Sequence, residues 1–198
     1  MIIDHPPASL PYTPVKVAFL TGLSNPECCS LSRTYQQFMS ELRCPESWKI
    51  YLNFPYIPSA EDEEKVSLLN ASMSNVRQFL GANSPLYRAS AQRHLTSVFA
   101  SADVLFLVVG SCGLEILNQA WTEAIAPDRV SVVALGPVAR QPPAASCLLI
   151  QGTHDYISRL FFRTVDVRLP DMGHMDYVTD RRVFDLVSRS LWHRLSTV

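Results

Sequence analysis

Three side chains that together could perform nucleophilic catalysis each follow an apolar, strand-like run of this 198-residue sequence. Cys112 follows "DVLFLVVG", Asp155 follows "SCLLIQG", and His174 follows "TVDVRLP". In such a set the thiol attacks, the imidazole takes its proton, and the carboxylate orients the imidazole. Because the carboxyl ends of parallel strands meet at one edge of a sheet, we expect these three side chains to lie close together.

The turn "GSCG", at residues 110–113, lies between the strand-like run "DVLFLVVG" and the helical pattern that follows it. Its composition is suited to presenting a nucleophile. Gly110 and Gly113 permit a sharp bend between strand and helix. The helix that begins near Gly113 points its positive end at Cys112, which favours the thiolate. The amides of Gly113 and of Leu23, on the loop after the first predicted strand, would then bind a developing oxyanion. Ser111 is the alternative nucleophile under a shift of one residue.

Strand-like runs alternate with helical patterns along the whole chain. This alternation predicts an α/β fold with a mostly parallel sheet of about six strands and helices on both faces. The predicted strands span 15–20, 48–54, 103–110, 129–135, 146–152 and 164–170. The predicted helices span 31–43, 59–81, 86–101, 113–125 and 181–195. Residues 1–14 are predicted to be an irregular N-terminal lead-in, and residues 15–198 a single domain.

Four segments, in this order along the chain, resemble the α/β-hydrolase fold family. "VAFLTGLSN" resembles its oxyanion loop, "VLFLVVGSCGLEIL" its nucleophile elbow, "LLIQGTHD" its acid-bearing turn, and "LPDMGHMDYVTDRRVFDLVSRSLW" its histidine loop and last helix. The resemblance covers residues 15–195 and implies a reduced, three-layer form of that fold. It also implies a triad of Cys112, Asp155 and His174, with cysteine in place of the usual serine, as in dienelactone hydrolase.

The sequence departs from the family pattern at two positions. Leu114 stands two residues after Cys112, where the elbow normally has glycine, and Thr21 stands where many members have histidine. These departures favour an alternative in which the fold is kept by a catalytically inactive binding or scaffolding protein. A weaker alternative is a doubly wound nucleotide-binding module, although no glycine-rich phosphate loop follows any predicted strand. Asp176 competes with Asp155 as the acid.

The predicted reaction is hydrolysis of an ester, lactone or thioester through an acyl-enzyme intermediate on Cys112. The small-molecule acyl substrate would bind to residues that follow strands or lie early in the long 54–101 connection. The residues assigned to substrate binding are Gly22, Ser111, Phe54 and Tyr56, with Tyr87 as a further candidate.

Composition and charge argue against nucleic-acid-binding, membrane-spanning, secreted and metal-binding proteins. The net charge of −1 and the absence of a basic run argue against a nucleic-acid partner. No apolar run is long enough to span a membrane, and the N-terminal residues do not read as a secretory signal. The five cysteines match neither a zinc site nor a disulfide framework, so we expect free thiols, a cytoplasmic location and no metal or other cofactor. The sequence does not settle the oligomeric state, and a homodimer is one option.

Overall fold

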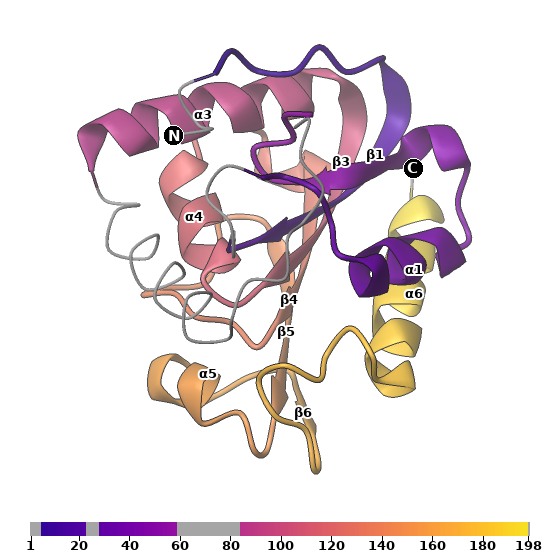
Figure 1. The fold of residues 1–198 in the computed structure, drawn as a ribbon, viewed down its shortest axis with the longest axis vertical. Coiled ribbons are helices and arrows are strands. Elements are labelled where there is room, and N and C mark those ends of the chain that lie inside the picture. The colour runs from indigo at the N-terminus through magenta and orange to yellow at the C-terminus, as the bar shows by residue number, and fades with distance from the viewer. Residues whose placement is uncertain (1–4, 23–27, 59–83, 198) are drawn as a thin grey trace.

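A six-stranded, all-parallel sheet lies between two layers of helices in the computed structural model, which describes residues 5–22, 28–58 and 84–197 (Figure 1). The strand order is β2-β1-β3-β4-β5-β6. The strands are β1 (Thr13–Thr21), β2 (Lys49–Asn53), β3 (Ala102–Gly110), β4 (Val130–Leu135), β5 (Ser146–Gly152) and β6 (Val167–Leu169). The helices are α1 (Arg33–Glu41), α3 (Pro85–Ala100), α4 (Gly113–Ala120), α5 (Tyr156–Phe161) and α6 (Arg181–Leu195), with short 3-10 turns at Glu46–Trp48 and Pro127–Arg129. The predicted fold class is confirmed.

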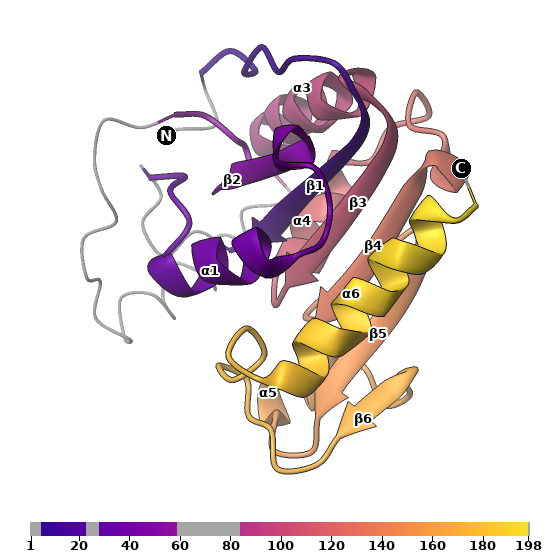
Figure 2. The same cartoon turned by 90° about the vertical axis from the view of Figure 1, so that its right-hand side faces the viewer.

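Two apolar cores, one on each face of the sheet, hold the layers together. Helices α1 and α6 cover one face, and α3 and α4 cover the other (Figure 2). In β3, Phe106 and Val108 face α1 and α6, whereas Leu107 and Val109 face α3 and α4. Because successive side chains point to opposite faces, a strand covered on both sides needs an unbroken apolar run, and this explains the composition of β3.

Most predicted elements are present, with changes at their ends. Helix α4 ends at Ala120 rather than at residue 125, because Trp121 adopts an extended backbone. Strand β6 is an edge strand of three residues, shorter than the predicted 164–170, and pairs only with β5. Strand β1 begins at Thr13, inside the predicted lead-in.

Two other differences concern whole helices. The predicted helix at 59–81 lies outside the described residues, and the division of the chain into a lead-in and one domain stays a prediction. Helix α5 was not predicted; it begins after Asp155, whose side chain accepts a hydrogen bond from the amide of Ser158 and so caps the helix. Among the described helices, none is both long and apolar enough to cross a membrane.

Helix α4 approaches strand β1 so closely that only glycine fits at its first position. A Cβ atom on Gly113 would lie 2.1 Å from the carbonyl oxygen of Leu20 and 3.0 Å from the Cα of Thr21. Both of these are backbone atoms of β1, so no side-chain rotation can relieve the contact. The glycine therefore sets how near the turn before α4 lies to the end of β1.

We expect Gly113→Ala to destabilise the protein by about 2 kcal/mol or more, because either α4 or β1 must move. At this chain length the loss corresponds to a fall of about 4–8 °C in Tm, measured by thermal denaturation. The matched control is Gly173→Ala, since a Cβ there would meet only the end of the Asp176 side chain, at 3.0 Å. Equal Tm values for Gly113→Ala and the wild type would contradict this account.

Candidate active site

Ser111 occupies the turn between β3 and α4 in a backbone conformation that L-residues rarely adopt. Its φ angle is +51°, in the left-handed region. The amide of Ser111 donates to the carbonyl of Leu135 at 3.0 Å, and its carbonyl accepts from the amide of Val138 at 3.1 Å. The last residue of β4 and the segment after it therefore hold the unfavourable conformation in place. A non-glycine residue held in this way at a strand-to-helix turn is the geometry of a nucleophile elbow.

An ion pair between a buried glutamate and a half-exposed arginine fixes the segment after β4 that supports this turn. Glu115, in the first turn of α4, is almost fully buried and binds the guanidinium of Arg140. The second oxygen of Glu115 accepts the backbone amide of Arg140 at 3.1 Å. Both the backbone and the side chain of Arg140 are thus tied to α4. This arrangement fixes the segment 136–140 against the helix that follows Ser111.

A continuous chain of hydrogen bonds joins Ser111, His174 and Asp155. The hydroxyl oxygen of Ser111 lies 2.9 Å from Nε2 of His174, and Nδ1 of His174 lies 2.9 Å from both carboxylate oxygens of Asp155. An ionised carboxylate only accepts, so Nδ1 carries a proton and Nε2 accepts from the serine hydroxyl. The side chain of His174 is 17% exposed and that of Asp155 is 0% exposed. The predicted proximity of Asp155 and His174 is therefore present.

Asp155 is buried yet kept ionised by its neighbours. Burial raises its pKa, but hydrogen bonds from His174, Tyr177 and the amide of Ser158 outweigh this effect and hold the pKa below its usual value. The competing acid, Asp176, accepts instead from the amide of Gly173 at 2.7 Å. The structure thus pairs His174 with Asp155, the residue whose position at the end of β5 had suggested it.

Cys112 does not face His174, contrary to the expectation from the sequence. Its side chain is 2% exposed, and burial raises the pKa of its thiol to about 12. The side chain in contact with His174 is that of Ser111, one residue earlier. The signal that could have identified Ser111 was Gly113, which stands two residues after it, where the elbow pattern requires glycine. Leu114, which departs from that pattern when counted from Cys112, is a buried core residue.

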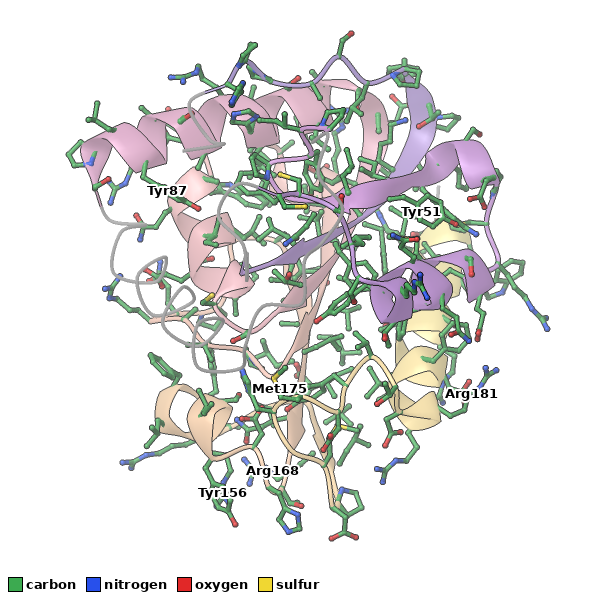
Figure 3. The ribbon with its side chains drawn as sticks, in the orientation of Figure 1. Tyr51, Tyr87, Tyr156, Arg168, Met175 and Arg181 are labelled. Atoms are coloured by element: carbon green, nitrogen blue, oxygen red, sulfur yellow. The ribbon has the colours of Figure 1, made fainter. Side chains whose placement is uncertain are left out.

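A cavity of about 280 Å³ opens beside Ser111 and His174. Its described lining contains no aspartate, glutamate, lysine or arginine. The apolar lining residues are Phe19, Leu31, Tyr35, Leu135, Met175, Tyr177 and Val178, and the polar ones include Thr21, Ser30, Ser32 and Asn53. Met175, which lines the cavity, follows His174 on the same loop. In Figure 3, Met175 lies toward the end of the molecule that carries Tyr156, the first residue of α5. The cavity suits a small, uncharged group.

The predicted substrate-binding residues divide into two groups. Gly22 and Ser111 line the cavity, as expected. Phe54 and Tyr56 do not: both are buried in the core on the α3 side, with their rings packed edge-on at 5.6 Å. They follow β2, but the chain turns inward there, so aromatic side chains that had suggested a pocket instead fill the core. Leu23, predicted to supply an oxyanion amide, lies outside the described residues.

Asn53 is a cavity residue that the sequence analysis missed. Its side-chain oxygen accepts the amides of Thr21 and Phe54, each at 2.9 Å. Its side-chain nitrogen donates to the carbonyl oxygen of Thr21 at 3.2 Å and to its hydroxyl at 2.9 Å. The amide group thus uses both acceptor sites and both donors, which neither Asp nor Leu could do. A polar residue at the end of the apolar strand "WKIYLN" was the available signal.

Comparison with known proteins finds similarity in structure only. No family model matches the sequence, and no curated protein matches it. The crystal structure of esterase PE8 superposes with a TM-score of 0.58 at 14% identity, over 94% of this chain and 95% of that one. An α/β-hydrolase candidate from Agrobacterium tumefaciens gives a TM-score of 0.46 at 13% identity, over 98% of this chain and 90% of that one. The chain therefore shares with esterase PE8 an α/β fold in which a parallel sheet lies between two layers of helices.

Proposed function

We propose that the protein is a serine-type ester hydrolase in which Ser111 is the nucleophile, His174 the general base and Asp155 the group that orients His174. The observation that carries this proposal is the unbroken Ser111–His174–Asp155 hydrogen-bond chain, with 2.9 Å at each step. The elbow conformation of Ser111 and the adjacent cavity support it. The fold shared with a protein named as an esterase is consistent with it.

The proposed reaction proceeds through an acyl-enzyme intermediate on Ser111. The hydroxyl oxygen attacks the substrate carbonyl while Nε2 of His174 takes its proton. When the tetrahedral intermediate collapses, the bond to the leaving group breaks, and His174 returns the proton to the departing oxygen. A water molecule then gives a proton to His174 and attacks the acyl carbon. The bond between the acyl carbon and the Ser111 oxygen breaks, His174 returns the proton to that oxygen, and the acid is released. This replaces the acyl-Cys112 intermediate predicted from the sequence.

The buried state of Cys112 argues against a thiol mechanism. The thiolate, not the thiol, is the attacking species. With a pKa of about 12, Cys112 carries almost no thiolate at neutral pH. Among the described residues, Nε2 of His174 bonds the hydroxyl of Ser111 and not the thiol of Cys112, so the imidazole is not placed to take the thiol proton.

The proposed oxyanion site changes with the nucleophile. With Ser111 attacking, the backbone amide that follows the nucleophile is that of Cys112, at the N-terminal end of α4. This replaces the amide of Gly113, whose role depended on a cysteine nucleophile. The second donor would come from the loop after β1, where Gly22 lines the cavity and Leu23 stays a prediction. Asn53 holds the start of that loop through its bonds to Thr21.

The cavity favours a short, uncharged acyl group. Its volume of about 280 Å³ lies just below the range for small-molecule sites, roughly 300–1,000 Å³. No carboxylate, ammonium or guanidinium of the described lining could pair with a charged substrate. Esters, lactones and thioesters of small carboxylic acids are the proposed substrate class. The inactive-protein alternative loses one of its two supports, because Leu114 no longer occupies the second glycine position of the elbow. Thr21 remains a departure from the family pattern, and Val109 now stands at the first glycine position.

Ser111→Ala tests the nucleophile directly. We expect p-nitrophenyl acetate or butyrate hydrolysis to fall by about a thousand-fold or more, since the attacking atom is removed. A fluorophosphonate probe should add its mass to the wild type at Ser111, located by peptide mass spectrometry, and should not label the variant.

Cys112→Ala is the matched control for that experiment. It removes the neighbouring sulfur and should retain probe labelling and most of the esterase activity. Loss of labelling in folded Cys112→Ala, with labelling kept in Ser111→Ala, would reverse the assignment.

Asn53→Asp tests the support of the oxyanion loop. An ionised carboxylate cannot donate to the Thr21 carbonyl, so we expect the loop to shift and kcat to fall by roughly ten- to a hundred-fold. Complete loss of one oxyanion donor costs about 10²–10³. We also expect a loss of about 1–3 kcal/mol in stability, seen as a lower Tm. Asn118→Asp is the matched control, because Asn118 is a half-buried residue outside the cavity lining whose side chain, among the described residues, donates to the carbonyl of Gln141. A kcat for Asn53→Asp equal to that of the control would refute the loop's role.

A further inference from the structure

We propose that Tyr177 is a positioning residue of the active site: its phenolic hydroxyl holds the Asp155 carboxylate in the orientation that His174 requires. The inference rests on the proposed function, because it assigns Asp155 and His174 to the reaction. It adds a fourth side chain that contributes without touching the substrate's reacting atoms.

Two hydrogen bonds fix the Tyr177 hydroxyl. It lies 2.6 Å from Oδ2 of Asp155, and the backbone amide of Gly152 donates to it at 2.9 Å. Because the Gly152 amide can only donate, the phenolic proton is free to point at the carboxylate. Burial and the nearby carboxylate raise the pKa of Tyr177 far above its usual value, so the hydroxyl keeps this proton at any working pH. Tyr177 is 5% exposed, and water therefore does not replace it easily.

Tyr177 connects the two chain segments that carry the acid and the base. It lies three residues after His174, on the loop before α6, whereas Gly152 ends β5 three residues before Asp155. One side chain thus bridges from the histidine loop to both the strand end and the carboxylate. Movement of either segment would stretch at least one of these two bonds.

A glycine on the neighbouring strand end leaves room for this pair. Gly136 follows β4 with φ of +54°, and a Cβ atom there would lie 2.7 Å from Oδ2 of Asp155 and 2.7 Å from the Tyr177 ring. Its amide is held by the carbonyl of Ile150 at 2.9 Å, so the backbone cannot easily move away. Both the conformation and the space at this position therefore favour glycine, and the space is filled by the Tyr177–Asp155 contact.

The contact completes the set of bonds that immobilises the carboxylate. Oδ1 accepts from the amide of Ser158 at 2.9 Å, and Oδ2 accepts from Tyr177. Held on both sides, the carboxylate presents both oxygens to Nδ1 of His174. Rotation about the Cβ–Cγ bond of aspartate is intrinsically broad, so loss of the Oδ2 bond would let the carboxylate turn. The bond also draws charge from the carboxylate and so weakens its hold on the proton shared with His174.

Tyr177→Phe removes the hydroxyl and keeps the ring. For hydrolysis of a p-nitrophenyl ester we expect kcat to fall about ten-fold, the loss of one hydrogen bond to a charged group, with KM unchanged. The Asp155–His174 pair should bind its proton more tightly, so the acid limb of the kcat/KM profile should move to higher pH by about half a unit. The same shift should appear in the pH dependence of fluorophosphonate labelling of Ser111, which needs no knowledge of the natural substrate.

Replacement of Tyr177 by 3-fluorotyrosine covers the case in which the phenylalanine variant folds poorly. The fluorinated phenol keeps the ring and hydroxyl but is a stronger donor, so the acid limb should move to lower pH. A merely structural tyrosine would not give shifts of opposite sign in the two variants. Tyr56→Phe is the matched control, because Tyr56 is fully buried and its hydroxyl has no hydrogen-bond partner among the described residues. It should leave kcat and the pH profile unchanged.

The outcomes separate this inference from the proposed function. If the wild type neither hydrolyses esters nor labels at Ser111, or if Ser111→Ala keeps the wild-type rate of ester hydrolysis, the proposed function fails. If the wild type is active and Ser111→Ala is not, but Tyr177→Phe keeps the wild-type kcat and acid limb, only the role of Tyr177 is overturned. An unchanged acid limb in the fluorotyrosine protein would overturn it as well.

Discussion

The backbone of Ser111, held at positive φ by the end of β4 and the segment after it, is the constraint on which the site depends. Its two hydrogen bonds with Leu135 and Val138 offset the unfavourable conformation. The conformation turns the hydroxyl of Ser111 out of the sheet toward His174 and leaves the next side chain, Cys112, in the interior. Which of two adjacent nucleophilic residues is presented is therefore a consequence of one backbone torsion.

The rest of the structure brings His174, the proposed base, to this fixed hydroxyl. The acid is buried, caps α5 and receives hydrogen bonds on both oxygens, so its charge is compensated without a cationic side chain. Such a carboxylate can hold an imidazole firmly because it has few other positions available. The base, in contrast, lies on a long loop after a three-residue edge strand, which gives it little support of its own. Hydrogen bonds from the Tyr177 hydroxyl to Gly152, at the end of β5, and to Asp155 hold the histidine loop in place, which the short strand β6 does not do alone.

The sequence alone determined the architecture and two of the three proposed catalytic residues. Apolar runs and helical periodicity are local properties, so the six strands and most helices could be located before any contact was known. The carboxyl ends of parallel strands meet at one edge, and this rule was enough to predict that Asp155 and His174 lie together. The fold and this pairing needed no knowledge of distances across the sheet.

The tertiary structure decided what depends on contacts between distant segments. The presentation of Ser111 rather than Cys112 depends on hydrogen bonds to Leu135 and Val138 that hold the Ser111 backbone at positive φ, and composition does not show these bonds. Asn53 and Tyr177 act through hydrogen bonds to residues 32 and 25 positions away, which no local pattern records. The aromatic residues after β2 fill the core rather than a pocket because the chain turns inward there. Whether a side chain is buried in the core or lines a cavity depends on how the elements pack against one another, and a local stretch of sequence does not contain that information.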